Sequence, residues 1–299
     1  MEHFYSLNRY FRETFGCKGY KLALQGGMTC PNRDGTLGTR GCIFCSGSSE
    51  FAETGETVTE QIAKAAERVK SKNKNGKYIA YFQDHTNTYA PVSVLKQKFS
   101  EAIAHPDVAV LSVATRPDCL PDEVLSLLSE LNRQKPVWVE LGLQTIHDTT
   151  ADFLRRGYPT GVYDEAVRKL HFHGISVVTH LILGLPGETP EMLFETVKHI
   201  GDIGTDGVKF HLLHILKGTD LAALYKQGKI SALSFPEYAS LLSECIRLLP
   251  RETVVHRITG DGDKRTLLAP LWSADKKHVL NSLNAYFDEH DVFQSQKRG

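Results

Sequence analysis

Short apolar runs alternate with amphipathic stretches along most of the chain. Six runs rich in β-branched and aromatic residues have strand length, and they cover residues 21–25, 78–82, 108–114, 137–143, 175–184 and 208–214. Apolar residues recur at helical spacing over 57–72, 121–134, 163–174 and 189–204. Near-continuous apolar strands separated by helices are typical of a parallel sheet covered on both faces. The pattern therefore predicts an α/β fold of six βα units, which suits an open, partial (βα)6, TIM-like barrel.

Both ends of the chain predict additions to this barrel. Residues 253–258 have the pattern of a seventh strand, and residues 273–287 have that of a helix. We expect the polar tail 288–299 to be loose and disordered. The predicted units are an N-terminal extension over 1–20, the barrel core over 21–215, and a C-terminal extension over 216–299 that packs on the barrel.

The composition and the amino-terminal sequence indicate where in the cell the protein is located, but not which molecule it binds. Lys and Arg number 35, against 35 Asp and Glu, so the net charge neither demands nor excludes nucleic acid. The amino terminus lacks the apolar region of a signal peptide, and no run reaches the roughly 18 apolar residues of a membrane span. We therefore expect a cytoplasmic protein without a membrane partner. Its thiols would stay reduced, so clustered cysteines indicate a metal site or catalysis rather than disulfides.

Three of the six cysteines lie in one segment, CPNRDGTLGTRGCIFC, which covers residues 30–45. Eleven residues separate Cys30 from Cys42, and two separate Cys42 from Cys45. The segment follows the first predicted strand, where the active site of a barrel would open. Three thiols leave two alternatives. Zinc would need a distant fourth ligand such as His85, whereas a [4Fe–4S] cluster held by three cysteines keeps one iron open.

Seven segments together make the sequence resemble the radical S-adenosylmethionine (SAM) superfamily. Within it, the sequence resembles a bacterial, YhcC/YtqA-like family with an atypical Cys-x11-Cys-x2-Cys loop, where the usual loop has three residues between the first two cysteines. The matching segments are GMTCPNRDGTLGTRGCIFCS (27–46), YFQDHTNTYAP (81–91), ATRPD (114–118), VELGLQT (139–145), LRRGY (154–158), HLILGLPGET (180–189) and HRITGDG (256–262).

This resemblance implies the cofactors of the site. Cys30, Cys42 and Cys45 would hold a [4Fe–4S] cluster, and SAM would bind its open iron. An external electron donor of the flavodoxin or ferredoxin type would reduce the cluster. Reductive cleavage of SAM would then generate a 5′-deoxyadenosyl radical.

The resemblance also assigns polar residues at strand ends to SAM. Gln83, after the second predicted strand, would meet the amino group of SAM. Glu140 and Gln144, on the fourth, would bind its ribose, because a carboxylate accepts hydrogen bonds from hydroxyls well. A glutamate inside an apolar strand is rarely tolerated without a partner, which favours a functional role for Glu140.

Two further segments complete the expected SAM groove. LRRGY supplies Arg155 and Arg156, and a guanidinium can bind a carboxylate with two parallel hydrogen bonds. We expect one of the two, Arg156 in preference to Arg155, to bind the SAM carboxylate. The turn LGLPGE matches the fifth-strand motif of the superfamily, so Gly184 and Pro186 are expected to lie against adenine.

The sixth predicted strand indicates the substrate side. Alternation points Lys209 and His211 to one face, and charged or polar groups on a buried strand are costly unless they meet a ligand. Both are therefore candidate catalytic residues in the barrel interior. The alternative is that they fringe the barrel and meet water.

The N-terminal segment mixes basic and aromatic residues, a composition that suits RNA backbone and stacked bases. In that reading Arg9, Arg12, Lys18 and Lys21 contact phosphates, although the same mixture suits a solvated amphipathic helix. The resemblance implies tRNA as partner, with the wobble uridine changed from carboxymethylaminomethyl to aminomethyl. Two alternatives stay open: a radical SAM enzyme acting on a peptide or small metabolite, and a zinc-binding RNA-binding module without catalysis.

Overall fold

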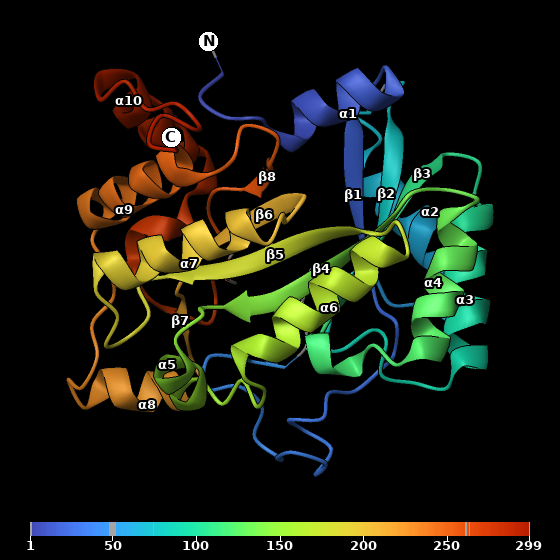
Figure 1. The fold of residues 1–299 in the computed structure, drawn as a ribbon, viewed down its shortest axis with the longest axis horizontal. Helices are drawn as coiled ribbons and strands as arrows, with labels where there is room; N and C mark the ends of the chain where they lie inside the picture. The colour runs from blue at the N-terminus through green and yellow to red at the C-terminus, as the bar shows by residue number, and fades with distance from the viewer. Residues whose placement is uncertain (1, 48–51, 74, 261, 263, 299) are drawn as a thin grey trace.

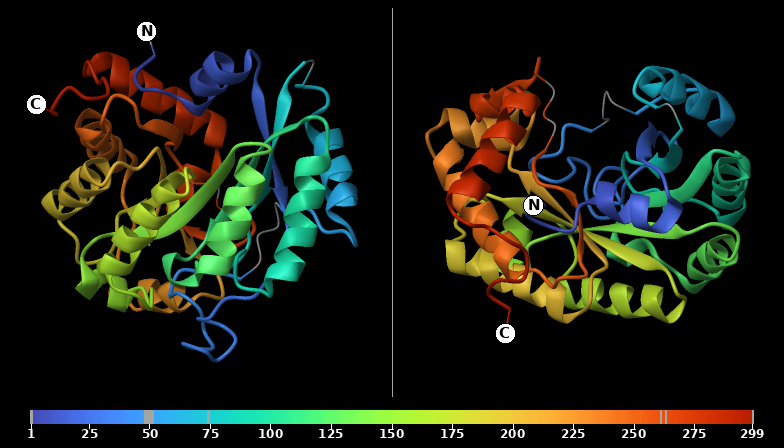
Figure 2. Two further views of the ribbon diagram at one scale, coloured as in Figure 1. Left: turned by 45° about the vertical axis from the view of Figure 1, so that its right-hand side comes forward. Right: turned by 90° about the horizontal axis from the view of Figure 1, so that it is seen from above.

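The main sheet of the molecule has seven strands, all parallel, in the order β1-β2-β3-β4-β5-β6-β8 (Figure 1). The computed structural model describes residues 2–47, 52–73, 75–260, 262 and 264–298. The strands are β1 (Gly19–Leu24), β2 (Lys77–Phe82), β3 (Val108–Thr115), β4 (Val137–Gln144), β5 (Ser176–Leu183), β6 (Gly207–Leu212) and β8 (Val254–Arg257). The sheet curls into a half-barrel (Figure 2), which confirms the predicted α/β partial barrel and its seventh strand.

Helices accompany the strands, and most of them cover the outer face of the sheet. They are α1 (Leu7–Phe15), α2 (Val58–Val69), α3 (Val92–Ala104), α4 (Asp122–Asn132), α5 (Asp148–Phe153), α6 (Thr160–Phe172), α7 (Pro190–Asp202), α8 (Asp220–Lys226), α9 (Phe235–Leu248) and α10 (Lys276–Glu289). Sequence periodicity located α2, α4, α6, α7 and α10 to within a few residues. It missed α3, α5, α8 and the small antiparallel pair β7 (Ile215–Leu216) and β9 (Leu267–Ala269).

Local capping signals set the starts of several helices. Before α2, the Thr57 side chain accepts a hydrogen bond from the Glu60 backbone N–H, and the Glu60 carboxylate accepts one from the Thr57 backbone N–H. Before α7, the Thr189 side chain accepts from the backbone of Met192, and Pro190 occupies the first helical position. Such caps contribute about 1 kcal/mol each and fix where a helix begins.

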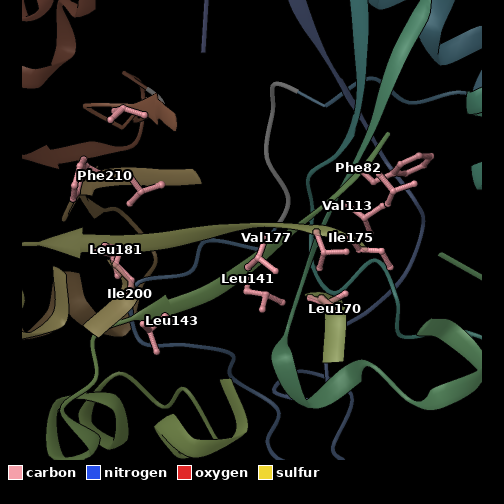
Figure 3. Packing of buried hydrophobic residues seen from close by; sticks show 14 of the residues in the cluster. Phe82, Val113, Leu141, Leu143, Leu170, Ile175, Val177, Leu181, Ile200 and Phe210 are labelled. Carbon is pink, nitrogen blue, oxygen red and sulfur yellow. The ribbon is translucent and has the colours of Figure 1, made fainter. Parts of the chain in front are cut away.

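The outer face of the sheet forms the main apolar core against these helices. Phe82 of β2 lies against Phe99 of α3, with ring centroids 5.1 Å apart, and the same buried cluster includes Phe210 of β6, Leu170 of α6 and Ile200 of α7 (Figure 3). Burying one such side chain stabilises the fold by roughly 1.5–3 kcal/mol. This packing holds the strands rigidly and leaves the inner face to carry polar groups.

Helix α1 closes the N-terminal end of the half-barrel. Its Phe11 is fully buried and packs with Ile79, Val110, Trp138 and Val178, which lie near the starts of β2 to β5. In Figure 1, α1 lies at the top, whereas the loop of residues 30–45, drawn in blue, lies at the foot. The cysteines and α1 therefore occupy opposite ends of the strands.

The position of α1 favours the amphipathic-helix alternative over a phosphate-binding segment. Arg9 pairs with Glu13 at 2.7 Å, and Arg12 pairs with Glu2 at 3.6 Å. Both arginines belong to the helix that lies far from the cysteines. Lys21 points into the barrel instead, so the predicted phosphate contacts of the N-terminal segment are not supported.

The C-terminal tail packs on the body, so the expected disorder is wrong for the described residues 288–298. Val292 is fully buried, and the Gln294 amide donates to the backbone carbonyl of Thr253 at 2.8 Å. The predicted C-terminal extension also supplies β8 to the main sheet, beyond the expected core boundary at residue 215. Among the described residues, no helix is long and apolar enough to cross a membrane.

Candidate active site

A cavity of about 390 Å³ opens inside the half-barrel at the C-terminal ends of the strands. Its wall combines the loop of residues 30–45, here called the cysteine loop, with side chains from β2 to β6 and β8. Of the predicted site residues, those in this wall are Cys30, Cys42, Cys45, Gln83, Glu140, Gln144, Arg156 and His211. The fold therefore brings most of the predicted site together.

Gly184 and Pro186 lie elsewhere. They line a second cavity, of about 840 Å³, between the turn after β5 and the start of α9. A side chain at residue 184 would be strained, since Gly184 has a φ of +86° and a Cβ there would meet Leu233 at 2.8 Å. The structure does not bring these two residues to the wall of the first cavity, and their contact with adenine stays a prediction.

The cysteine loop is held in shape by its own backbone. The N–H of Arg33 donates to the Cys30 carbonyl at 2.8 Å, and the N–H of Cys45 donates to the Cys42 carbonyl at 3.0 Å. The Arg33 side chain crosses the loop and donates to the Cys45 carbonyl at 2.8 Å. Gly41 makes this crossing possible, because a Cβ there would lie 2.9 Å from the Arg33 guanidinium.

A second loop, residues 154–158, anchors the cysteine loop to the barrel. The Asn32 amide donates to the carbonyl of Arg155 at 2.7 Å and also points at the Cys42 sulfur, 3.4 Å away. The backbone N–H of Ile43 donates to the Leu154 carbonyl at 3.1 Å. The LRRGY segment therefore positions the cysteines.

Arg156 holds the anchoring loop in place, and its expected contact with the SAM carboxylate stays a prediction. Its side chain is 2 % exposed, and all five of its N–H groups are engaged. Their acceptors are the carbonyls of Leu143, Thr145 and Tyr158, the Asp148 carboxylate and the Thr160 hydroxyl. Every donor is therefore engaged by the protein, and a bond to the SAM carboxylate would require some of these contacts to rearrange.

The chemistry of the three thiols fits an iron–sulfur cluster. Burial, followed by the proximity of Cys45, raises the pKa of Cys42 to about 11, while the Asn32 hydrogen bond acts in the opposite direction. A metal would reverse this preference by binding the thiolate. An amide aimed at a sulfur is a typical contact around such clusters. In the described ranges, no three His, Cys, Asp or Glu side chains already surround a common metal position, so the fit rests on donor chemistry.

Glu140 is the centre of a buried polar network beneath the cavity. One carboxylate oxygen accepts from Ser112 at 2.6 Å and from Lys21 at 3.2 Å. The other accepts from His180 at 2.7 Å and from Lys209. Both oxygens are therefore engaged by protein donors, and the predicted ribose contact stays a prediction that would require this network to rearrange.

Electrostatics keep the Glu140 carboxylate ionised. Its side chain is 1 % exposed, and burial acts to raise its pKa. The charges of Lys209 and Lys21, together with the His180 hydrogen bond, outweigh burial and lower the pKa of Glu140 well below its usual range.

The two candidate catalytic residues on β6 both face the barrel interior, as the alternation predicts. Lys209 is 2 % exposed and pairs with Glu140, so it does not fringe the barrel. His211 lines the cavity, and its Nε2 is buried with no hydrogen-bond partner among the described residues. A catalytic role for either residue stays a prediction.

Sequence reasoning missed the interior roles of Lys21, His180 and Arg257. The first two bind Glu140, and Arg257 lines the cavity from β8. Strand alternation carried a usable signal, since a polar residue interrupts the apolar run of β1 and of β5. Their convergence on one carboxylate depends on the curvature of the sheet.

Comparison with known proteins defines the class. Residues 35–200 match the model of the radical SAM superfamily, and residues 205–289 match the radical SAM C-terminal domain. The chain is 46 % identical over 299 residues to YtqA of Bacillus subtilis, covering 99 % of this chain and 92 % of that protein. It is 40 % identical over 281 residues to YhcC of Escherichia coli, covering 93 % and 90 %.

Some more distant relatives have names that state a substrate. A tRNA uridine(34) acetyltransferase of Methanocaldococcus jannaschii is 29 % identical over 199 residues, which is 66 % of this chain and 36 % of that protein. The solved structure of Methanocaldococcus infernus Elp3 aligns with a TM-score of 0.72 and 18 % identity, covering 92 % of this chain and 64 % of that one. The latter likeness shows the fold.

The chain belongs to the radical SAM superfamily and, within it, to the family of YtqA and YhcC. Membership confirms the two predicted cofactors, a [4Fe–4S] cluster and SAM.

Proposed function

We propose that this protein is a radical SAM enzyme that modifies the wobble uridine of tRNA, cutting a carboxymethylaminomethyl group back to aminomethyl. SAM would be the two-electron oxidant, consumed as methionine and 5′-deoxyadenosine; water would hydrolyse the oxidised C–N bond, and the carboxymethyl carbons would leave as a two-carbon oxo acid. The observation that carries the proposal is the shared cavity. Three cysteines of one loop meet Gln83 and Gln144 at the C-terminal edge of a radical SAM half-barrel. Relatives named for tRNA uridine(34) support the choice of nucleotide.

Each part of the cavity has a task in this proposal. When bound, the cluster and SAM supply a carbon radical able to take a hydrogen atom from an unactivated C–H bond. Cys30, Cys42 and Cys45 hold the cluster, while Gln83 and Gln144 orient SAM. A reductant of the flavodoxin or ferredoxin type provides the electron. The apolar layer around Phe11 excludes water from the opposite end.

The wobble base must leave its stack to reach this cavity. Extrusion costs a few kcal/mol, and less from a single-stranded anticodon loop than from a duplex. A tRNA loop is therefore a suitable substrate for a site recessed inside a barrel.

Iron content tests the cluster part of the proposal. Anaerobic reconstitution should load about four irons per chain, and Cys30→Ala, Cys42→Ala and Cys45→Ala should each abolish loading. Cys245→Ala is the matched control, because that thiol is buried in α9 outside the cavity wall. Stable zinc without iron uptake would instead favour the zinc-binding RNA module.

Nucleoside analysis tests the substrate. Loaded, reduced enzyme with SAM and tRNA carrying carboxymethylaminomethyluridine should yield aminomethyluridine in digests analysed by mass spectrometry. An enzyme with a fully loaded cluster that cleaves SAM but never forms this nucleoside would refute the tRNA assignment. A peptide or small metabolite would then be the alternative substrate.

A further inference from the structure

We propose that His180, held by Glu140, is the base that activates water to hydrolyse the oxidised C–N bond of the substrate; this rests on the proposed function. Hydrolysis is faster when a positioned group takes a proton from water while the water oxygen attacks carbon. His180 lies on β5 and lines the cavity. Its side chain is 18 % exposed, so part of the imidazole is accessible from the cavity.

Glu140 fixes which nitrogen of the imidazole carries the proton. Nε2 of His180 lies 2.7 Å from a carboxylate oxygen of Glu140. Because the lowered pKa of Glu140 keeps this carboxylate ionised, it can only accept, and His180 donates through Nε2. The lone pair of the neutral ring is then on Nδ1. Within the described part of the chain, Nδ1 has no hydrogen-bond partner, and unlike Nε2 of His211 it is not sealed off.

The surroundings keep the imidazole neutral and oriented. Burial, followed by the charge of Lys209, lowers the pKa of His180 to about 4, so Nδ1 is unprotonated near neutral pH. The ring packs beside that of His211, with centroids 5.0 Å apart. A weak base suffices here, because an oxidised C–N bond is a reactive electrophile. The ionised Glu140 would stabilise the imidazolium that forms when the proton is taken.

His180 lies below the cysteine loop, deeper in the half-barrel. It precedes Leu183, the last residue of β5, by three positions, which is roughly 10 Å along a strand. Its register partner on β4 is Gly142, which has no side chain and also lines the cavity. An arm that extends from an extruded base past the rim therefore approaches the level of His180.

Other ionisable groups of the interior are less suited to this step. Lys209 is 2 % exposed and is bound to Glu140. Nε2 of His211 is buried. His85 also lines the cavity, but the described ranges contain no carboxylate bound to it. His180 combines an orienting carboxylate with an accessible nitrogen.

The proposed step balances without a further reactant. In the oxidised arm, a double bond joins the nitrogen to the outer carbon. The water oxygen bonds to that carbon, while Nδ1 of His180 takes one water proton and passes it to the nitrogen. Nδ1 then takes the remaining O–H proton and passes it to the nitrogen as the C–N bond breaks. The nitrogen becomes the amine of aminomethyluridine, the carbon becomes the aldehyde of the oxo acid, and no electrons are transferred.

A borodeuteride quench separates oxidation from hydrolysis. Loaded, reduced enzyme is mixed with SAM and the carboxymethylaminomethyl tRNA, and samples are quenched with sodium borodeuteride. The reagent reduces any accumulated C=N bond, which returns the starting nucleoside with one deuterium that mass spectrometry detects. The amount of 5′-deoxyadenosine in the same sample measures the oxidation.

His180→Gln removes the base but keeps an amide donor for Glu140. Its 5′-deoxyadenosine should form at the wild-type rate. Aminomethyluridine should appear about a hundredfold more slowly, which is the lower end of what a positioned base contributes. Deuterated starting nucleoside should accumulate in this variant and stay near background in the wild type.

His199→Gln is the matched control. Nε2 of His199 also lies 2.7 Å from a carboxylate, that of Asp164, but this pair joins α7 to α6 outside the cavity wall. The control should behave as the wild type. His180→Asn, which also lacks a base, should repeat the result of His180→Gln and replaces it if glutamine prevents folding.

The outcomes are distinct. Aminomethyluridine formed by the His180 variants at the wild-type rate would overturn the assignment of the base. So would a parallel loss of 5′-deoxyadenosine and aminomethyluridine, because His180 would then act before hydrolysis. A wild-type enzyme that forms no aminomethyluridine would overturn the proposed function itself and this step with it.

The tautomer is tested on loaded protein without SAM, reductant or tRNA. In protein labelled with [15N]histidine, the imidazole signal that His180→Gln removes should show a protonated Nε2 and a bare Nδ1 near neutral pH. The opposite tautomer would overturn the proposal whatever the tRNA assays show, since Nδ1 would then have no lone pair to accept a proton.

Discussion

The Glu140→Gln substitution should destabilise the protein far more than an ordinary loss of a surface charge. The carboxylate is 1 % exposed and is contacted by Ser112, Lys21, His180 and Lys209. Glutamine keeps the size of the side chain but removes its charge. Lys209, itself 2 % exposed, then stays buried without its anion.

The magnitude follows from this burial. Breaking a buried ion pair by removing one partner costs roughly 3–5 kcal/mol, because the remaining charge is neither hydrated nor paired. That free energy corresponds to a change of roughly two to nearly four powers of ten in the unfolding equilibrium. Glu130→Gln is the matched control. Its carboxylate pairs with Lys96 at 3.1 Å on the surface, where such pairs contribute about 0–1 kcal/mol.

Urea unfolding followed by circular dichroism measures the difference through the midpoint at constant m-value. Adding Lys209→Met to Glu140→Gln should recover part of the lost stability, since the orphaned cation is removed as well. If Glu140→Gln proves as mild as Glu130→Gln, the interior network does not hold the barrel together as described.

Three further perturbations separate structural from chemical roles. Arg156→Met should lower the free energy of unfolding by about 3 kcal/mol or more, because buried carbonyls lose their donors; a stable variant that fails only to bind SAM would instead favour the predicted contact with the SAM carboxylate. Phe11→Ala should cost about 3–5 kcal/mol in urea unfolding and yet keep its iron, whereas loss of iron from a folded variant would contradict the placement of α1. Burial, followed by Lys209, lowers the pKa of His180 to about 4. The unfolded chain therefore binds the proton first, and stability should fall as the pH drops from about 6.5 towards 4. His180→Phe should flatten part of that slope, and an unchanged slope would exclude His180 as its source.

The secondary-structure elements and the cysteine loop could be identified from the residues alone. Strand and helix periods are local properties, set by which face of each element is buried, so the parallel strands and about half of the described helices could be placed without coordinates. The spacing of Cys30, Cys42 and Cys45 is likewise a property of the sequence and does not depend on how the other residues fold. Alternation was also enough to turn Lys209 and His211 towards the barrel interior.

Contacts between side chains far apart in the sequence could be seen only in the folded molecule. Glu140 finds Lys21, His180 and Lys209 on three other strands, since sheet curvature and register bring residues up to 119 positions apart onto one carboxylate. The same long-range geometry turned Arg156 into the anchor of the cysteine loop. The local sequence pattern predicts which interactions a side chain can make. Residues distant in the chain then occupy its hydrogen-bond donors and acceptors, and this determines its role.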